Sequence, residues 1–341
     1  MTESSWLLLL TVIGGLYMAW NIGANDVANA MGTSVGSGAL TLRRAILIAA
    51  VFEFSGAVLV GTHVTDTIRS GLVDTTLFEP TGPLGADGPF VLAIGMFSAL
   101  LAAGIWLQMA THWGLPVSTT HSIVGAVVGF GFVALGTAGV RWAEVSVIAV
   151  SWVISPITGA LIAWAMFAFI RSSILRRSDP AEAARRVGPY LVGLVAVILI
   201  LSFIYKALKN VISEPPLILV IGTSLFGGVL AALITSWILR RRTQEQPNPY
   251  VYVERVFGWL QIITAIFVAF AHGANDVANA IGPLAAVVNI IGSDFAELPH
   301  SVPVPFWVMA LGGVGIVVGL ATWGYKVIAT IGKEITELTP S

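Results

Sequence analysis

The sequence predicts an all-α integral membrane protein that crosses the bilayer many times and contains two inverted repeats. Of its 341 residues, 56% are hydrophobic and only 10% are charged, and the mean hydropathy is +0.88. The octapeptide GANDVANA occurs twice, at residues 23–30 and 273–280. The absence of cysteine excludes disulfides, thiolate metal sites and cysteine-linked haem. These observations define a multi-pass protein with a duplicated polar motif.

Apolar stretches of about 20 residues, the length that crosses a bilayer, predict the membrane-spanning helices. The first stretch lacks the basic segment and cleavage site of a signal peptide, so we expect it to be retained. The predicted helices lie near residues 6–25, 45–63, 89–110, 120–138, 146–170, 187–208, 216–239, 252–272 and 304–325.

The distribution of basic residues predicts the orientation of the chain. When the loops are placed alternately on two sides, most of the 17 Lys and Arg residues fall on one side. The exceptions are Arg69, Arg141, Lys206 and Lys209. Because cytoplasmic loops carry an excess of Lys and Arg, we expect a cell membrane protein, plasma or inner membrane, with its N-terminus outside.

The two octapeptides mark two repeats of opposite orientation. The second copy lies seven predicted crossings after the first, and an odd number of crossings inverts it. Similarity extends further, because Val64–Ile68 resembles Val327–Ile331 at an offset of 263 instead of 250. Inverted repeats of this kind are typical of secondary transporters, whose sites lie at the repeat interface. We therefore expect a first repeat at 1–170, a cytoplasmic linker at 171–186, connecting helices and a basic loop at 187–250, and a second, incomplete repeat at 251–341.

Each octapeptide places an acidic residue inside a membrane helix. An Asp at the bilayer centre costs about 2.5 to 3.5 kcal/mol on insertion scales. Asp26 and Asp276 are therefore predicted to belong to a duplicated ion or ligand site, although a structural hydrogen-bonded carboxylate is the alternative at each position.

A third polar interruption, GLPVSTTH at residues 114–121, is predicted to be the tip of a helical hairpin. Pro116 ends one helix because it lacks a backbone donor, and Ser118 suits the N-cap of the next. Free amides and the positive end of a helix favour an anion, and Thr119 and Thr120 add hydroxyl donors. The alternative is an ordinary N-cap in a short polar loop.

The octapeptide pair together with GLPVSTTH resembles the inorganic phosphate transporter (PiT) family along essentially the whole chain. The resemblance implies an inverted-repeat secondary transporter with broken helices and a helical hairpin, which takes up phosphate with Na+, or with H+ or as a metal phosphate in other branches. It also implies site residues. Na+ would be bound by Asp26, Asn29, Asp276 and Asn279, and phosphate by Ser118, Thr119, Thr120, Asn25 and Asn275.

Physical chemistry agrees with this assignment. Na+ is a hard cation that favours oxygen ligands, which carboxylates, amides and the carbonyls exposed by helix breaks at Gly23 and Gly273 would supply. A bound cation offsets the charge of each Asp, so we expect the cation to bind before phosphate. Na+ is thus expected as the coupling ion, with no other cofactor.

Glu53 is a further ionisable residue inside a predicted helix. Either it relays a proton or cation, or it forms a buried hydrogen bond between helices. No Glu occupies the corresponding place in the second repeat, near Ile316.

Other functions remain as alternatives. Proton-coupled phosphate transport or a sulfate permease would use similar hydroxyls and amides. An intramembrane aspartyl hydrolase would need two carboxylates that share a proton at close range, and an anion channel would need a pore with basic rings. We expect no enzyme activity.

The expected partners are inorganic phosphate, sodium ions and the lipid bilayer, without nucleic acid. The chain ends where the second repeat would continue into its own hairpin. Two interpretations stay open: the sequence is a truncated piece of the transporter, or a homo-oligomer or another chain supplies this hairpin.

Overall fold

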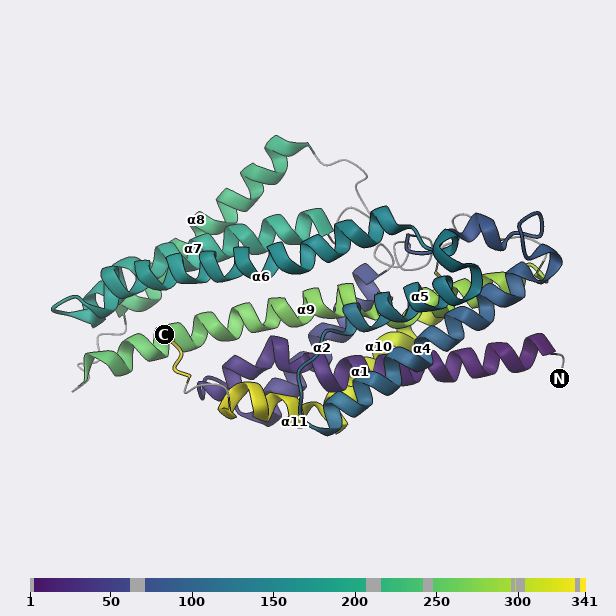
Figure 1. Ribbon diagram of the computed structural model, residues 1–341. Helices are drawn as coiled ribbons and strands as arrows, with labels where there is room; N and C mark the ends of the chain where they lie inside the picture. Colours follow the sequence, from purple (N-terminus) through teal and green to yellow (C-terminus); the bar gives the residue numbers. More distant parts are fainter. Residues whose placement is uncertain are drawn as a thin grey trace. The chain divides into compact units, whose positions relative to one another are not determined.

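The computed structural model describes residues 3–61, 71–206, 216–241, 248–295, 298, 304–334 and 338–341 (Figure 1). These residues form helices and one isolated antiparallel β-bridge, between Val73 and Val140. The predicted repeat segment Val64–Ile68 lies outside the described residues, as do Arg69, Lys209 and Arg242. The described part of the chain is therefore all-α, as predicted.

All nine predicted spans coincide with helices, although several helices are longer than expected. Seven of the described helices are long and apolar enough to cross a membrane, and the pair formed by α10 and α11, bent by 56°, makes eight if it is one span. Helix α2, the ninth predicted span, is not among these candidates. The helices are α1 (Glu3–Gly36), α2 (Leu42–Val60), α4 (Gly88–His112), α5 (Thr119–Leu135), α6 (Trp142–Ile170), α7 (Pro180–Lys206), α8 (Leu217–Arg241), α9 (Pro249–Gly292), α10 (Phe306–Thr322) and α11 (Gly324–Ala329).

The prediction that Gly23 and Gly273 break their helices is wrong. Helix α1 continues through Gly23 to Gly36, and α9 continues through Gly273 to Gly292. Both glycines instead allow another helix to approach closely, because a Cβ at Gly23 would overlap the carbonyl oxygen of Ile316, and one at Gly273 that of Glu53. In membrane helices small residues allow such close packing. The octapeptides therefore offer side chains, and not helix-break carbonyls, to a ligand.

The chain divides into two compact units, which are described separately. The first contains Met1–Ala149 and Val268–Leu338, and the second contains Val150–Phe267 and Thr339–Ser341. The first unit combines the octapeptide helices of both predicted repeats, α1 and the end of α9, with the hairpin of α4 and α5. The boundaries of the repeats and the linker stay a prediction, because the units are defined by contacts in space and the repeats by similarity in sequence.

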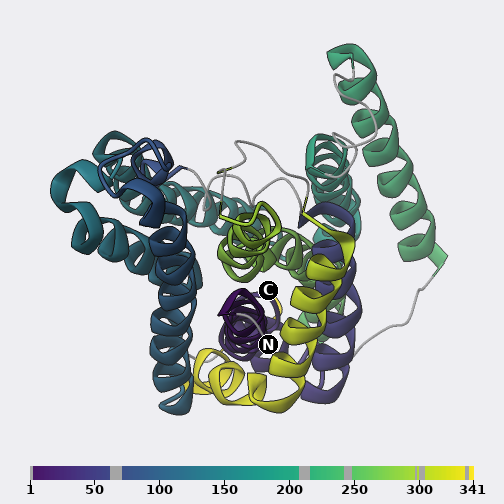
Figure 2. The same cartoon turned by 90° about the vertical axis from the view of Figure 1, so that its right-hand side faces the viewer.

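The first unit contains two equivalent helix crossings. Helix α1 packs on α10, with Gly23 at Ile316 and Gly319 at the Trp20 carbonyl. Figure 2 shows α1, in purple, between α4 on one side and the neighbouring α10 and α2 on the other.

The second crossing joins α9 to α2 in the same way. Gly273 meets Glu53, and Gly56 meets the Phe270 carbonyl. The two crossings correspond residue by residue. In the octapeptide helices, Gly23 and Gly273 are 250 positions apart, as are Trp20 and Phe270. In the helices that they contact, Glu53 and Ile316 are 263 positions apart, as are Gly56 and Gly319. Each octapeptide helix therefore packs against the second helix of the other repeat.

The second unit packs α7 against α8 and against the beginning of α9. Its buried apolar cluster consists of Ile174, Ala184, Leu191, Tyr252, Val253, Val256 and Phe257.

Candidate functional site

The hairpin tip between α4 and α5 has Ser118 at the predicted N-cap, but α4 ends at His112, before Pro116, so the prediction that Pro116 ends this helix is wrong. Gly114 has φ 69°, a left-handed conformation that glycine adopts without steric cost, and it follows the end of α4. The Ser118 hydroxyl caps α5 by accepting a hydrogen bond from the His121 backbone N–H at 3.2 Å. The tip therefore presents the N-terminal turn of α5.

Asn25 of the first octapeptide fixes this tip to α1. Its amide nitrogen donates to the Thr111 hydroxyl at 2.8 Å and to the Leu115 carbonyl at 3.0 Å, and its amide oxygen accepts from the Val117 N–H at 3.0 Å. Both amide hydrogens are used in this way, and the side chain is buried. In the structure Asn25 positions the tip, and its predicted contact with phosphate stays a prediction.

Thr119 connects the tip to both octapeptides. Its hydroxyl donates to the Asp26 carboxylate at 2.6 Å and accepts a hydrogen bond from the Asn279 amide at 3.4 Å. The Asn279 amide also lies 3.1 Å from the Thr120 hydroxyl. Asp26 is only 3% exposed, so the Thr119 hydroxyl solvates a nearly buried carboxylate. One residue of the tip thus joins α1 to α9.

The two octapeptides share one internal contact and differ in their surroundings. Asn29 donates to Asp26 and Asn279 to Asp276, each at 3.4 Å across three residues of its own helix. Asn29 is exposed, whereas Asn279 is buried against the tip. The repeated sequence therefore gives the same local geometry in two different environments.

His272, one turn before Asp276, gathers three carboxylates. Its Nε2 lies 2.9 Å from Asp276 Oδ2 and 3.5 Å from Asp26 Oδ2, and its Nδ1 lies 3.2 Å from Glu53 Oε2. Ligand atoms of Asp26, His272 and Asp276 all lie within 4.8 Å of one another, so these three residues form a candidate metal-binding group. Sequence reasoning assigned His272 to no such cluster. The spacing of His272 and Asp276, i and i+4 on one helix, was the available signal.

The polar pair of His272 and Glu53 exists at only one of the two equivalent crossings. By the repeat offsets, its counterparts at the α1–α10 crossing are Ile22 and Ile316, which are both fully buried. Glu53 is also fully buried, and burial of a charge is costly unless it is paired. The cluster therefore favours a positive charge, on His272 or on a bound cation, among its carboxylates.

A cavity of about 330 Å³ opens between the tip and the two octapeptides. Among the predicted site residues, Asn279 contacts two residues that line the cavity, Thr119 and Thr120. Glu53 contacts His272, and Asn275 is half-buried. The cavity is lined by Asp26, Asn29, Pro116, Val117, Ser118, Thr119, Thr120 and Asp276.

The arrangement combines inverted membrane helices, acidic residues from both copies and a helix N-terminus at one cavity, which defines an inverted-repeat membrane transporter. A sequence profile of the phosphate transporter family matches residues 22–341. The chain belongs to this family, whose members are transporters and not enzymes.

Individual relatives agree with this assignment. A candidate phosphate permease of Pyrococcus furiosus is 46% identical over 337 residues, which cover 98% of this chain and 77% of the relative. The inorganic phosphate transporter 2-1, chloroplastic, of Arabidopsis thaliana is 44% identical, with 99% and 60% covered. A solved structure of a sodium-dependent phosphate transporter has a TM-score of 0.83 and 40% identity, with 98% of this chain and 80% of that chain covered.

Proposed function

We propose that this chain moves inorganic phosphate across a cell membrane together with Na+, and that both bind at the cavity between the hairpin tip and the octapeptides. The observation that carries the proposal is the Thr119 hydroxyl, which contacts Asp26 of one repeat and Asn279 of the other. The Thr119 hydroxyl therefore connects the hairpin tip, which is suited to an anion, to carboxylates that are suited to a cation.

Phosphate would bind at the N-terminus of α5. The Ser118 hydroxyl accepts from His121, so its own proton is available to a ligand. The Thr120 hydroxyl also lines the cavity, and the first backbone N–H groups of a helix have no partners within that helix. The positive end of the helix dipole adds to the attraction. The Thr119 proton is directed to Asp26, so Thr119 would link phosphate to the cation site.

Na+ would bind at Asp26 and Asp276, whose carboxylates supply the oxygen ligands that a hard cation favours. Asn29 and Asn279 would orient these carboxylates through the contacts that they make within their own helices, and their amide oxygens are further candidate ligands.

The charges at the cavity predict the order of binding. Two unit charges about 4 Å apart repel by about 4 kcal/mol at an effective dielectric constant of 20. Phosphate would meet this repulsion at Asp26 and Asp276 unless a cation were already bound. We therefore infer that Na+ binds first and that its binding raises the affinity for phosphate.

Proton coupling is the second candidate, and the position of His272 favours it. A protonated imidazole between Asp26 and Asp276 would supply the same positive charge as Na+. Glu53, which contacts the opposite edge of the ring at 3.2 Å, would then hold His272 in place. The relay role of Glu53 belongs to this candidate.

Uptake of labelled phosphate into proteoliposomes tests the proposal. An inward Na+ gradient should drive uptake that K+ and a pH gradient do not drive, and excess sulfate should not compete. Asp26→Asn should abolish this uptake, and Asp87→Asn, in the short helix Gly85–Asp87 away from the cavity, should not. Uptake driven only by a pH gradient would favour the second candidate, and competition by sulfate would contradict the assignment of the substrate.

A further inference from the structure

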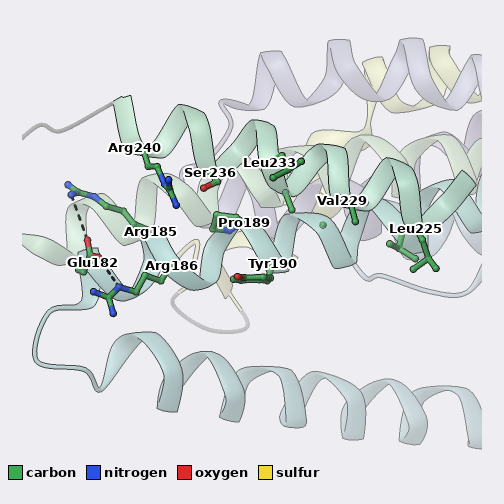
Figure 3. A pocket seen from close by; sticks show the side chains of 14 residues that line it. Glu182, Arg185, Arg186, Pro189, Tyr190, Leu225, Val229, Leu233, Ser236 and Arg240 are labelled. Carbon is green, nitrogen blue, oxygen red and sulfur yellow. Dashed lines mark hydrogen bonds and ion pairs between the residues drawn. The ribbon is translucent and has the colours of Figure 1, made fainter. Parts of the chain in front are cut away.

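A second cavity, within the second unit, takes no part in the proposed transport site. It is a groove of about 910 Å³ along α7 and α8 (Figure 3). Its lining residues are Glu182, Arg185, Arg186, Pro189, Tyr190, Gly193, Val197, Leu225, Gly228, Val229, Ala232, Leu233, Ser236 and Arg240.

Two glycines bring the helices of this groove together. A Cβ at Gly193 would lie 2.9 Å from the Gly228 carbonyl oxygen, and a Cβ at Gly228 would lie 2.8 Å from the Gly193 carbonyl oxygen. Because the two backbones are in contact at this point, the larger side chains on either side form the walls of the groove along the helix pair.

The groove is charged at one end and apolar along its length. Figure 3 shows Arg185, Arg186 and Arg240 at one end, with Val229 and Leu225 toward the other. Ser236 lies eleven positions after Leu225, which corresponds to about 16 Å of helix. This length is about half of the 30 Å hydrocarbon core of a bilayer, so the apolar part matches one leaflet.

The charged end has an excess of positive charge. Glu182 pairs with Arg186 at 2.9 Å and approaches Arg185 at 4.0 Å. The Arg185 guanidinium also lies over the Tyr252 ring, 5.1 Å from its centroid, and Arg240 forms no ion pair with the described carboxylates. Three guanidinium groups against one carboxylate leave donors for an anion, and guanidinium matches the geometry of a phosphate group.

We propose that this groove binds one anionic phospholipid, with its phosphate at the arginines and an acyl chain along Val229 and Leu225. Basic pockets between membrane helices bind anionic headgroups, and the basic end lies among the loops that the charge distribution places in the cytoplasm. Free phosphate would use the arginines but would leave the apolar wall exposed to water. The combination of both surfaces therefore favours a lipid. This proposal is independent of the transport site.

Native mass spectrometry of the full chain in detergent tests the proposal with two lipids of equal acyl length. Phosphatidylglycerol should remain bound, and phosphatidylcholine should bind at least tenfold more weakly. Arg185→Gln combined with Arg240→Gln should reduce phosphatidylglycerol binding about tenfold. Arg43→Gln, an exposed basic residue outside the groove, should have no effect. Val229→Trp, which fills the apolar part, should also displace the lipid.

Four outcomes would overturn the proposal. These are equal retention of the two lipids, an equal loss with Arg43→Gln, displacement of phosphatidylglycerol by millimolar inorganic phosphate, and protein dimers that carry no lipid. The third would identify an ionic phosphate site, and the fourth would identify a second copy of the chain as the occupant. Thermal unfolding of each variant separates lost binding from lost folding.

Discussion

At the scale of single residues, the proposed site is joined by one hydroxyl group, that of Thr119, which contacts a residue of each octapeptide. The Asp26 carboxylate is nearly buried, and its shortest described contact is the Thr119 hydroxyl at 2.6 Å. A hydrogen bond to a charged group contributes about 1.5 to 3 kcal/mol. Thr119 is therefore expected to influence the affinity of the proposed cation site, although it belongs to the tip that we propose binds phosphate.

Replacement of Thr119 by Val, which keeps the shape and removes the hydroxyl, tests this link. Thr119→Val should lower Na+-dependent phosphate uptake by about 10- to 100-fold, which corresponds to the free energy of one charge-assisted hydrogen bond. Thr119→Ser keeps the hydroxyl and should retain most of the uptake. Equal rates for the Val variant and the unmodified chain would show that the contact with Asp26 does not matter.

The sequence could identify residues whose signal is local. Asp26 stands out because a carboxylate in a membrane helix is costly. Ser118 stands out because it lies two residues after Pro116 and directly before a helix, whose N-cap it forms. His272 was missed because two of its three carboxylate partners, Asp26 and Glu53, come from helices far away in the chain. Only the contact with Asp276 was visible as a helical spacing. The anchoring role of Asn25 depends equally on the tertiary position of the tip.

At the scale of helices, the two crossings determine the position of both octapeptides. The sequence indicated where the helices lie, but it could not show whether Gly23 and Gly273 break a helix or allow close packing, since glycine serves both purposes. The structure shows close packing at both. The glycines consequently bring Ile316 and Glu53 against the octapeptide helices.

Alanine substitutions distinguish the packing glycines from other glycines. Gly23→Ala and Gly273→Ala should each destabilise the protein by more than 1 kcal/mol, because the added methyl group overlaps a carbonyl oxygen. At Gly129, within α5, an added Cβ would meet nothing within 4 Å. Gly129→Ala should therefore be neutral or stabilising by up to about 1 kcal/mol. Midpoints of thermal unfolding in detergent measure the difference, and three equal midpoints would contradict the crossing geometry.

The asymmetry between the crossings predicts the behaviour of the polar pair. His272→Ile alone should destabilise the protein by about 3 to 5 kcal/mol, because it leaves Glu53 buried without its partner. The double variant His272→Ile with Glu53→Ile copies the Ile22 and Ile316 pair of the other crossing. It should recover most of the lost stability, as apolar replacements of buried ion pairs often do.

A double-mutant cycle on unfolding midpoints measures this coupling. Strictly additive effects of the two substitutions would show that His272 and Glu53 act independently.

At the scale of the whole molecule, the sequence predicts that the two repeats have opposite orientations and that most basic loops share one side of the membrane. The predicted orientation assigns each connecting loop to one side of the membrane. Because the chain contains no cysteine, every introduced cysteine is a unique label. Ala86 and Ser178 are both exposed in connecting segments, and the predicted orientation places them on opposite sides.

A membrane-impermeant maleimide reagent applied to intact cells tests the orientation. Ala86→Cys should react from outside, and Ser178→Cys should react only after the membrane is opened. The reverse pattern would place the N-terminus inside, and equal reaction of both would contradict the number of crossings between them.

Linkage between Na+ and phosphate is the central claim, because it unites the two octapeptides and the hairpin tip in one site. If two ligands stabilise each other, each must raise the affinity of the other by the same factor. In the proposed mechanism, the physical source of this linkage would be the repulsion between phosphate and the two carboxylates, which a bound cation would remove.

The most direct measurement is the binding of labelled phosphate to the purified chain at increasing Na+ concentration, with choline as the replacement cation. Phosphate affinity should rise at least tenfold with Na+, and Asp26→Asn and Asp276→Asn should each abolish the rise. A phosphate affinity that is the same with and without Na+ would contradict the shared site.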